Sequence, residues 1–373
     1  MSFKKPLFTA LTAASLLLPA LAAGPALAET VVGMAGPITG SSASFGEQMR
    51  RGAEMAVADI NAKGGLLGET LRLINVDDAS NPSQGVAVAN KLATEGAVAV
   101  FGHFNSAVSI PASKVYADEG ILQISPASTN PQLTEQGFDT VFRTCGRDDQ
   151  QGDVAAAWIV KNHKADRIAI IHDQTTYGKG LADATKAALN KAGVKEAMYD
   201  AVTVGDRDMA ALVTKMKNAG IQVVYFGGLY TEAGLLTRQI ADGGLTVQFM
   251  SGDGVVDSEY WNIAKDTAEG ALVTFGAESR TRPEAADVVK RFRGQGFEPE
   301  AYTLYTYAAV QAWAQAAAKA KSTDTAKVAK AMRDGSYKTV IGDLSFDEKG
   351  DRKVTDYVVY RWSKGSYTQL AGQ

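Results

Sequence analysis

Three short loops carry side chains suited to holding a small charged molecule, and each follows a predicted strand. The first is GHFNSAVSIP, residues 102–111, which offers hydroxyls and backbone N–H groups at the start of a predicted helix, with Pro111 suited to its first turn. Unpaired N–H groups and the positive end of a helix dipole attract anions. The loop therefore predicts an anion site, although Ser106 or Ser109 acting only as a helix cap is the simpler explanation of this loop taken alone.

The second and third loops offer acceptors. In SPASTNP, residues 125–131, two prolines restrict the backbone around Ser128 and Thr129, so that carbonyls and hydroxyls together suit an ammonium group, which has three donors. In SGDG, residues 251–254, Asp253 would supply the counter-charge for that ammonium if it faces the other two loops. A plain turn also explains each loop, and Asp253 would then stabilise its turn through the local backbone.

The sequence contains none of the common catalytic motifs. There is no GxSxG elbow, no GxxxxGK[ST] phosphate loop and no HExxH pair. The GGLLG run at residues 64–68 follows a helix instead of joining a strand to a helix, so it predicts no dinucleotide site. His103 shares a short loop with Ser106, and a structural role is its simpler interpretation. With one cysteine, Cys145, and three histidines, we expect no internal disulfide, no metal site and no cofactor.

Length and composition indicate a globular protein of two domains. The chain has 373 residues, of which 46% are hydrophobic and 21% charged, so a disordered chain is not expected. The net charge is −3 and no dense basic run occurs, which argues against nucleic-acid binding.

The N-terminus has the pattern of an export signal. Two lysines at positions 4–5 precede an apolar region over 7–23, and ALA at 26–28 fits a small-x-small cleavage site. Prolines and a glycine interrupt the stretch, which disfavours a membrane anchor. We expect a signal peptide over residues 1–28, cleaved after Ala28, and no membrane span in the mature form.

Short β-rich runs alternate with longer helical runs, a pattern typical of parallel sheets covered by helices. Predicted strands lie at 30–35, 71–76, 97–101, 121–124, 167–171, 223–226, 247–250 and 357–362. Predicted helices lie at 46–61, 83–95, 111–119, 155–162, 180–192, 209–219, 232–242 and 302–321. In such folds ligands bind beyond the carboxyl ends of the strands, where the three loops lie.

At these loops the sequence resembles the leucine/isoleucine/valine-binding proteins, the periplasmic solute receptors of branched-chain amino-acid ABC transporters. The matching blocks run through the mature chain and include GAEMAVADINAKGG, GHFNSAVSIPAS, GILQISPASTNPQLT, FRTCGRDDQQG, HDQTTYGKGLA, YFGGLYTEAG and FMSGDGV. The resemblance implies the type I periplasmic binding protein fold: two Rossmann-like α/β lobes with parallel sheets flanked by helices, joined by a three-segment hinge. The lobes would comprise residues 29–147 plus about 277–350, and 148–276 plus about 351–373.

The resemblance also implies roles for particular residues. Ser106 would hold the ligand carboxylate, while the carbonyl of Ala127 and the hydroxyl of Thr129 would accept from the ammonium. Tyr177 would close over the ligand, and Asp253 would pair with the ammonium. Further expected site residues, most of them lining the side-chain pocket, are Phe45, Phe104, Asn105, Ser128, Leu229 and Tyr302. Together they would suit a zwitterion, because burying either charge unpaired costs several kcal/mol.

Several departures from the family leave specificity open. Ser80 and Asn105 stand where the best-known members carry a disulfide, Asp253 replaces a longer glutamate, and Leu229 replaces an aromatic wall. The expected function is an exported amino-acid receptor for aliphatic or branched-chain amino acids, monomeric, periplasmic, without catalysis, delivering ligand to an inner-membrane ABC permease. The alternatives are a broader receptor including alanine, proline and γ-aminobutyrate, or an amide or urea receptor of the same fold. A ligand-responsive regulator and an enzyme are the other classes considered.

Overall fold

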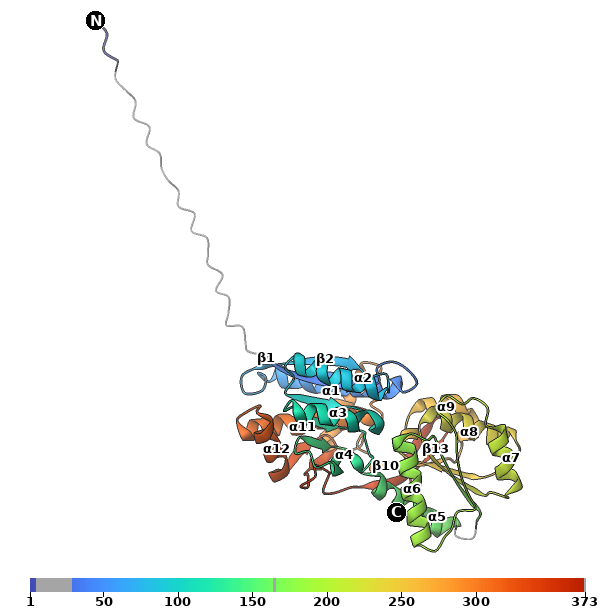
Figure 1. Cartoon of the computed structure of the whole chain (residues 1–373). Helices are drawn as coiled ribbons and strands as arrows, with labels where there is room; N and C mark the ends of the chain where they lie inside the picture. Colours follow the sequence, from blue (N-terminus) through green and yellow to red (C-terminus); the bar gives the residue numbers. More distant parts are fainter. Residues whose placement is uncertain (5–28, 164–165, 372–373) are drawn as a thin grey trace.

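The computed structural model describes residues 1–4, 29–163 and 166–371. The predicted signal peptide, apart from its first four residues, lies outside the described residues. Two α/β bodies, each built on its own sheet, lie side by side (Figure 1). This arrangement confirms the predicted fold class.

The first sheet is fully parallel, with strand order β2-β1-β3-β4-β5. Its strands are β1 (Glu29–Gly36), β2 (Thr70–Asp77), β3 (Ala99–Gly102), β4 (Leu122–Ser125) and β5 (Val141–Arg143). Its helices are α1 (Ala43–Ala62), α2 (Pro82–Thr94), α3 (Ser106–Asp118), α4 (Gln132–Glu135), α10 (Ala286–Gly294), α11 (Tyr302–Ala320) and α12 (Thr325–Asp334), with the 3-10 turn η3 (Pro283–Ala285) and the small hairpin β11 (Tyr337–Thr339) and β12 (Gly342–Leu344).

Alternation along the strands divides the first core between the two faces of the sheet. Phe101 packs with Trp313 of α11 on one face, with ring centroids 5.8 Å apart. Its neighbour Val100 packs with Leu92 of α2 and Tyr116 of α3 on the other face. Because successive side chains point to opposite faces, a run of apolar residues such as β3 is buried on both.

The second sheet is mixed, with strand order β14-β13-β10-β9-β8-β6-β7. Its strands are β6 (Ile168–His172), β7 (Met198–Ala201), β8 (Val223–Gly227), β9 (Gln248–Ser251), β10 (Leu272–Gly276), β13 (Tyr357–Ser363) and β14 (Ser366–Gln369). Its helices are α5 (Asp148–His163), α6 (Thr176–Lys191), α7 (Ala210–Asn218), α8 (Tyr230–Asp242) and α9 (Ser258–Ala264), with the 3-10 turns η1 (Asp253–Val255) and η2 (Lys265–Ala268).

The expectation of purely parallel sheets needs correction for this second sheet. β13 pairs antiparallel with β10, and β14 pairs antiparallel with β13. The two last strands form a hairpin whose turn residues, Lys364 and Gly365, both have positive φ, the conformation that two-residue hairpins require. The chain therefore ends in an antiparallel addition to the edge of an otherwise parallel sheet.

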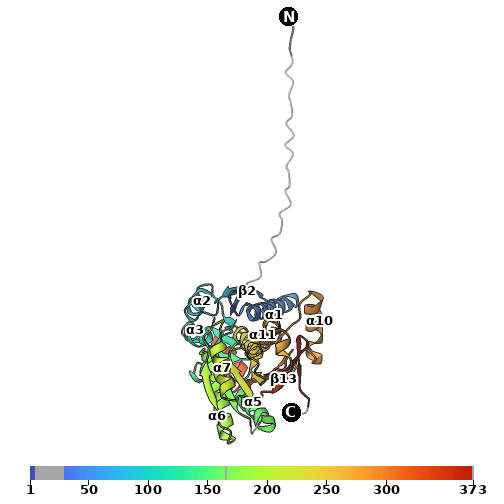
Figure 2. The same ribbon diagram turned by 90° about the vertical axis from the view of Figure 1, so that its right-hand side faces the viewer.

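The chain passes between the two sheets three times: between β5 and α5, between β10 and η3, and between β12 and β13. Figure 2 shows α11 beneath α1, and these two helices from opposite ends of the chain pack against each other. The predicted lobe boundaries at 147/148, 276/277 and 350/351 fall at or within these crossings and stay a prediction. Among the residues that the structure describes, no helix combines the length and the apolarity needed to cross a bilayer.

Several helices begin earlier than predicted, and for α3 the difference affects the site. α3 begins at Ser106, so Pro111 lies inside the helix and not in its first turn. Asn105 is extended (φ −72°, ψ 130°), so the chain enters the helix directly from the loop after β3. Burial of Val108 and Ala112 in the extended helix outweighs the local preference of proline for a helix start.

Candidate functional site

A cavity of about 110 Å³ lies where the strand-end loops of the two sheets face each other. Residues of the first sheet's loops, together with the start of α11, line one side: Ser41, Ser42, Ser80, Phe104, Asn105, Ser106, Ala107, Ala127 and Tyr302. Loops of the second sheet line the other side: Thr175, Tyr177, Val204, Leu229, Asp253 and Gly254. All three loops singled out in the sequence contribute to it.

Most of the predicted site residues line this cavity, namely Phe104, Asn105, Ser106, Ala127, Tyr177, Leu229, Asp253 and Tyr302. Phe45, Ser128 and Thr129 are not among its lining residues. Phe45 stacks on Phe104 with ring centroids 4.4 Å apart and so supports the wall from behind. The Ser128 hydroxyl bonds the Ser109 hydroxyl at 2.5 Å and the Phe104 carbonyl at 2.9 Å, which ties the loop after β4 to the loop after β3.

Asp253 forms the centre of the acidic side. It begins η1, one residue beyond the end of β9, and is 1% exposed. Tyr177 donates to its Oδ1 at 2.7 Å, and Tyr302 donates to its Oδ2 at 2.8 Å. Gln151 donates to Oδ1 at 3.0 Å and accepts the Asp253 backbone N–H at 2.8 Å. A carboxylate offers about four acceptor positions, so these three side-chain donors leave room for one more.

The electrostatics of this cluster follow from its burial. Burial raises the pKa of Asp253, and the hydrogen bonds from Tyr177, Gln151 and Tyr302 oppose that rise by favouring the charged form. Burial and the Asp253 carboxylate together raise the pKa values of Tyr177 and Tyr302, so both phenols remain donors. The cluster is a buried acceptor group held in place by neutral donors.

Gln151 was not among the predicted site residues. It lies on α5, and its Oε1 also accepts from Thr274 of β10 at 2.8 Å, so it connects the Asp253 turn to two neighbouring elements. Gln151 lies in the block FRTCGRDDQQG, whose resemblance to the family was the one sequence feature that could have suggested a role in the site. The contact with Asp253 is evident only from the packing of α5 near η1.

The opposite side of the cavity presents the N-terminus of α3. The N–H groups of Ser106 and Ala107 have no intrahelical acceptor, because they precede the first full turn. Both residues line the cavity, and Ser106 is 1% exposed. Ala127, from the loop after the neighbouring strand β4, lines the same region. The helix start therefore offers donors to an anion in a water-poor place.

A second buried acid lies beside the cluster and was also not predicted. Asp148 is 0% exposed, and neither of its carboxylate oxygens has a hydrogen-bond partner among the described residues. Its backbone N–H donates to the Thr129 carbonyl at 2.9 Å. Burial, followed by the charge of Asp253, raises the pKa of Asp148 well above its ordinary value, and the smaller opposing effects of the Thr129 hydroxyl and the Arg143 charge do not offset that rise. The carboxyl group is thus strongly biased towards its neutral form.

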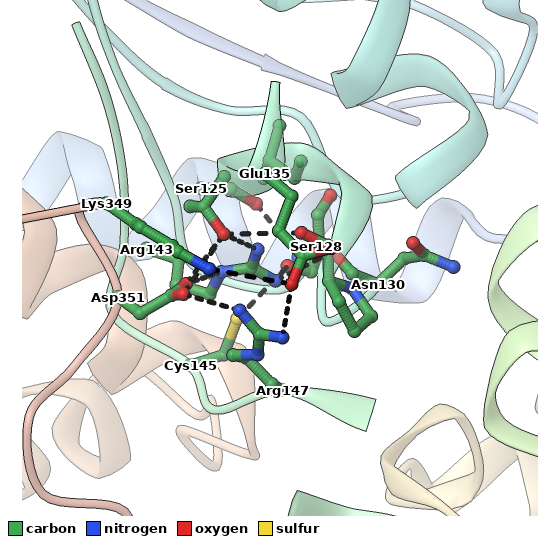
Figure 3. A network of polar contacts seen from close by, with 12 residues as sticks. Ser125, Ser128, Asn130, Glu135, Arg143, Cys145, Arg147, Lys349 and Asp351 are labelled. Carbon is green, nitrogen blue, oxygen red and sulfur yellow. Dashed lines mark hydrogen bonds and ion pairs between the residues drawn. The ribbon is translucent and has the colours of Figure 1, made fainter. Parts of the chain in front are cut away.

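A buried ionic network holds the loop after β4 from below (Figure 3). Arg143 is 0% exposed; its Nε lies 2.7 Å from Asp351 Oδ1, and its Nη1 donates to the Ser128 carbonyl at 2.7 Å. Arg147 reaches the other oxygen of Asp351 at 2.9 Å. The network connects the first and third crossings between the sheets and fixes the loop that carries Ala127.

His103 has a structural role. Its Nδ1 lies 2.6 Å from Asp78 and its Nε2 lies 3.0 Å from the Tyr116 hydroxyl, with all three residues buried within the first body. Both ring nitrogens therefore have hydrogen-bond partners, and neither partner is a serine that could act as a nucleophile. In the described ranges, no group of three or more histidine, cysteine, aspartate or glutamate side chains is arranged to hold a metal ion.

Direct bonds also join the two bodies around the cavity. Asn130 donates to the Thr176 carbonyl at 2.9 Å, and Tyr230 donates to the Ser41 carbonyl at 2.7 Å. Gln48 donates to Asp257 at 2.8 Å. The facing loops are thus in contact on several sides of the cavity.

Comparison with known proteins agrees with this geometry. Residues 29–366 match the family model described as periplasmic binding protein. The Leu/Ile/Val-binding protein homolog 1 of Brucella suis is 56% identical over 344 residues, covering 92% of this chain and 93% of the relative. An amino acid binding protein of Pseudomonas aeruginosa is 54% identical, with 92% and 93% covered. Among solved structures, a leucine binding protein of Thermotoga maritima superimposes with a TM-score of 0.85 at 27% identity, covering 92% of this chain and 98% of that one. The chain belongs to the periplasmic binding protein family.

Proposed function

We propose that this protein is the periplasmic receptor of an amino-acid ABC importer and binds its ligand as a zwitterion in the cavity between the two sheets. The observation that carries the proposal is the pairing of Asp253 with the N-terminus of α3 across one small cavity. The carboxylate side would take the ammonium, and the N–H groups of Ser106 and Ala107 would take the carboxylate. An uncharged amide or urea would pair poorly with both the Asp253 carboxylate and the N–H groups at the start of α3.

The remaining walls suit an aliphatic body. Phe104, Leu229 and Tyr302 line the cavity, and Phe45 supports Phe104. Apolar contact with such walls favours aliphatic and branched-chain side chains. The names of the Brucella and Thermotoga relatives, Leu/Ile/Val-binding protein homolog and leucine binding protein, support this assignment.

Binding would act by closure of two lobes about the three crossings. The lobes are those with boundaries near 147/148, 276/277 and 350/351. A ligand that touches Ser106 and Ala127 on one side and Tyr177 and Asp253 on the other binds the closed state preferentially, and this difference drives closure. The closed receptor, without catalysis of its own, would then deliver the ligand to an inner-membrane permease.

Isothermal titration calorimetry on the unfolded, dialysed and refolded mature chain tests the proposal. The panel is the twenty amino acids, γ-aminobutyrate, urea, acetamide and benzoate. The proposal is supported if leucine, isoleucine and valine each bind with a measurable heat and a stoichiometry near one to one. The broader specificity is supported if alanine, proline and γ-aminobutyrate bind with similar affinity. Binding of urea or acetamide without any amino acid would overturn it.

A further inference from the structure

We propose that Asp257 and Glu300 form a proton-operated latch between the two bodies, so that the receptor closes more readily and holds its ligand more tightly in mildly acidic than in mildly alkaline medium. The inference rests on the proposed function, because the latch acts on the closure described there. It comes from a second place where the bodies meet, apart from the ligand cavity, at which they bring two carboxylates close together.

A groove of about 240 Å³ marks this second place. It is lined from the first body by α1 and the loop before α11, and from the second body by Ser258, the first residue of α9. Among the described residues, the groove shares no lining residue with the ligand cavity. A change of charge here can therefore act on closure without touching the ligand.

Asp257 joins the second body to α1 of the first. It is 0% exposed, and as the N-cap of α9 it accepts the Glu259 N–H on Oδ1 at 2.8 Å. Its Oδ2 accepts from the Ser44 hydroxyl at 2.6 Å and from the Gln48 amide at 2.8 Å. The Gln48 oxygen accepts the Tyr302 N–H at 3.1 Å, which ties the start of α11 to the same contact. Burial raises the pKa of Asp257, and these donors oppose the rise by favouring the charged form.

Glu300 reaches the same place from the first body. It lies two residues before α11, and its Oε2 lies 3.4 Å from both the backbone N and the Oγ of Ser258, at the long end of hydrogen-bond distances. Burial, followed by the charge of Asp257, raises the pKa of Glu300 to about 7, while the Ser258 bonds and the charge of Arg280 oppose that rise. Of the two carboxylates, Glu300 is thus the one that takes up a proton near neutral pH.

The surrounding charges do not change in this pH range. The further charged or titratable side chains that act on the pair or line the groove are Glu47, Tyr230, Glu259, Arg280, Glu298 and Tyr367. Burial of Glu47 is more than offset by hydrogen bonds from two arginines, which lower its pKa. The hydrogen bond from Arg293 lowers the pKa of Glu298. Burial raises the pKa values of both tyrosines, so the change of charge near pH 7 is assigned to Glu300.

The sign of the effect follows from proton linkage. Opening would separate Glu300 from Asp257 and return it to water, where its pKa is that of an ordinary glutamate. The closed form therefore binds a proton more tightly than the open form, and closure takes up protons. The contribution of Glu300 to closure is complete below the ordinary value of 4.5 and is lost as pH rises through about 7. Above that pH, the two carboxylates carry like charges and oppose closure.

Calorimetry with leucine on the full mature chain tests the latch, and Glu300→Gln is the central variant because it is neutral at every pH. Other acids titrate too, so the measured quantity is the ratio of variant to wild-type affinity at each pH. This ratio should rise about three- to tenfold from pH 6 to pH 8. At pH 6.5, in buffers of different ionisation enthalpy, the wild type should take up about half a proton more per leucine bound than the variant.

Glu298→Gln is the charge-matched control in the same groove. Its carboxylate is ionised at both pH values, so its affinity ratio to the wild type should not change with pH. Asp257→Asn is a second test, because it removes the like charge that Glu300 meets on closure. Proton uptake should shrink in this variant, even if altered bonds to Ser44 and Gln48 weaken leucine binding at every pH.

The outcomes separate the two proposals. A ratio for Glu300→Gln that does not change with pH, or that rises equally in Glu298→Gln, would overturn the latch and leave the amino-acid receptor standing. Undiminished proton uptake in Asp257→Asn would also overturn it. If no amino acid of the panel binds to a wild-type chain that melts cooperatively, the proposed function fails and the latch fails with it.

Discussion

Tyr302 donates a hydrogen bond to Asp253 over 2.8 Å, although the tyrosine begins a helix packed on the first sheet and the aspartate follows a strand of the second. The bond joins the two bodies at the cavity that both residues line, and both side chains are almost completely buried. The acid that we assign to the ammonium is thus partly oriented by the opposite body.

Replacement of Tyr302 with phenylalanine should weaken leucine binding by about 1 kcal/mol, because one bond between the bodies is lost and Asp253 becomes less well oriented. Calorimetry with leucine measures the change. Tyr260→Phe is the control, since the Tyr260 hydroxyl bonds Thr237 within the second body and Tyr260 does not line the cavity. Equal losses in the two variants would contradict a specific role for the Tyr302 hydroxyl.

Asp253→Asn should weaken binding of every α-amino acid by about 2–4 kcal/mol, because the ammonium would be buried without an opposite charge. The measurement is the dissociation constant of leucine, with the exposed Asp266→Asn as the charge-matched control. An affinity within threefold of wild type would remove Asp253 from the ammonium site.

Asp148→Asn should stabilise the protein at pH 8 by about 1–3 kcal/mol, because wild-type Asp148 must either ionise without a partner or hold a proton that the unfolded chain releases. Since the pKa of Asp148 is raised in the folded state, its favourable contribution is present below the unfolded pKa and is lost as pH rises towards the folded value. The gain from Asn should therefore shrink towards pH 4.

Urea unfolding at pH 4, 6 and 8 measures that dependence. Several other acids titrate in the same range, including Asp173, whose pKa burial raises to about 6. The difference between variant and wild type at each pH isolates Asp148. A stabilisation independent of pH, or a loss of stability at pH 8, would contradict the assignment.

Arg143→Met should destabilise the protein by about 2–4 kcal/mol, because it removes the fully buried partner of Asp351 and leaves Arg147 as the cation paired with this buried carboxylate. Chemical unfolding gives the value, and adding Asp351→Leu should restore part of it. Lys330→Met breaks an exposed pair on α12 and should not change the unfolding midpoint measurably. A double variant no more stable than the single one would show that the cost does not come from the lost pairing of Asp351.

Cys145 should not react with a disulfide reagent in the native protein. Its side chain is 2% exposed, and burial raises the pKa of the thiol to about 12. Absorbance after adding the reagent should show no release of chromophore until guanidinium chloride is added, and then one thiol for each chain. Rapid reaction in the native state would contradict the burial of this segment.

The sequence alone determined the alternating elements and the loops that carry the site. Local periodicity located strands such as β3 and β8 because buried parallel strands are continuous apolar runs with glycines and helices around them. Ser106, Ala127 and Asp253 could be singled out because ligands bind at strand ends and because the surrounding blocks resemble a known family. The strand at 357–362 was predicted, but the antiparallel direction of β13 and the whole of β14 were not, since strand direction depends on where the chain returns and not on its composition.

Only the tertiary structure decided which of these residues meet. Gln151 and Tyr302 reach Asp253 from positions 102 and 49 residues away along the chain, and no local pattern encodes such contacts. The burial of Asp148 beside Asp253 likewise depends on what the fold places around it. Residue type sets what a side chain can bond, whereas burial and the neighbours supplied by distant segments set whether it does.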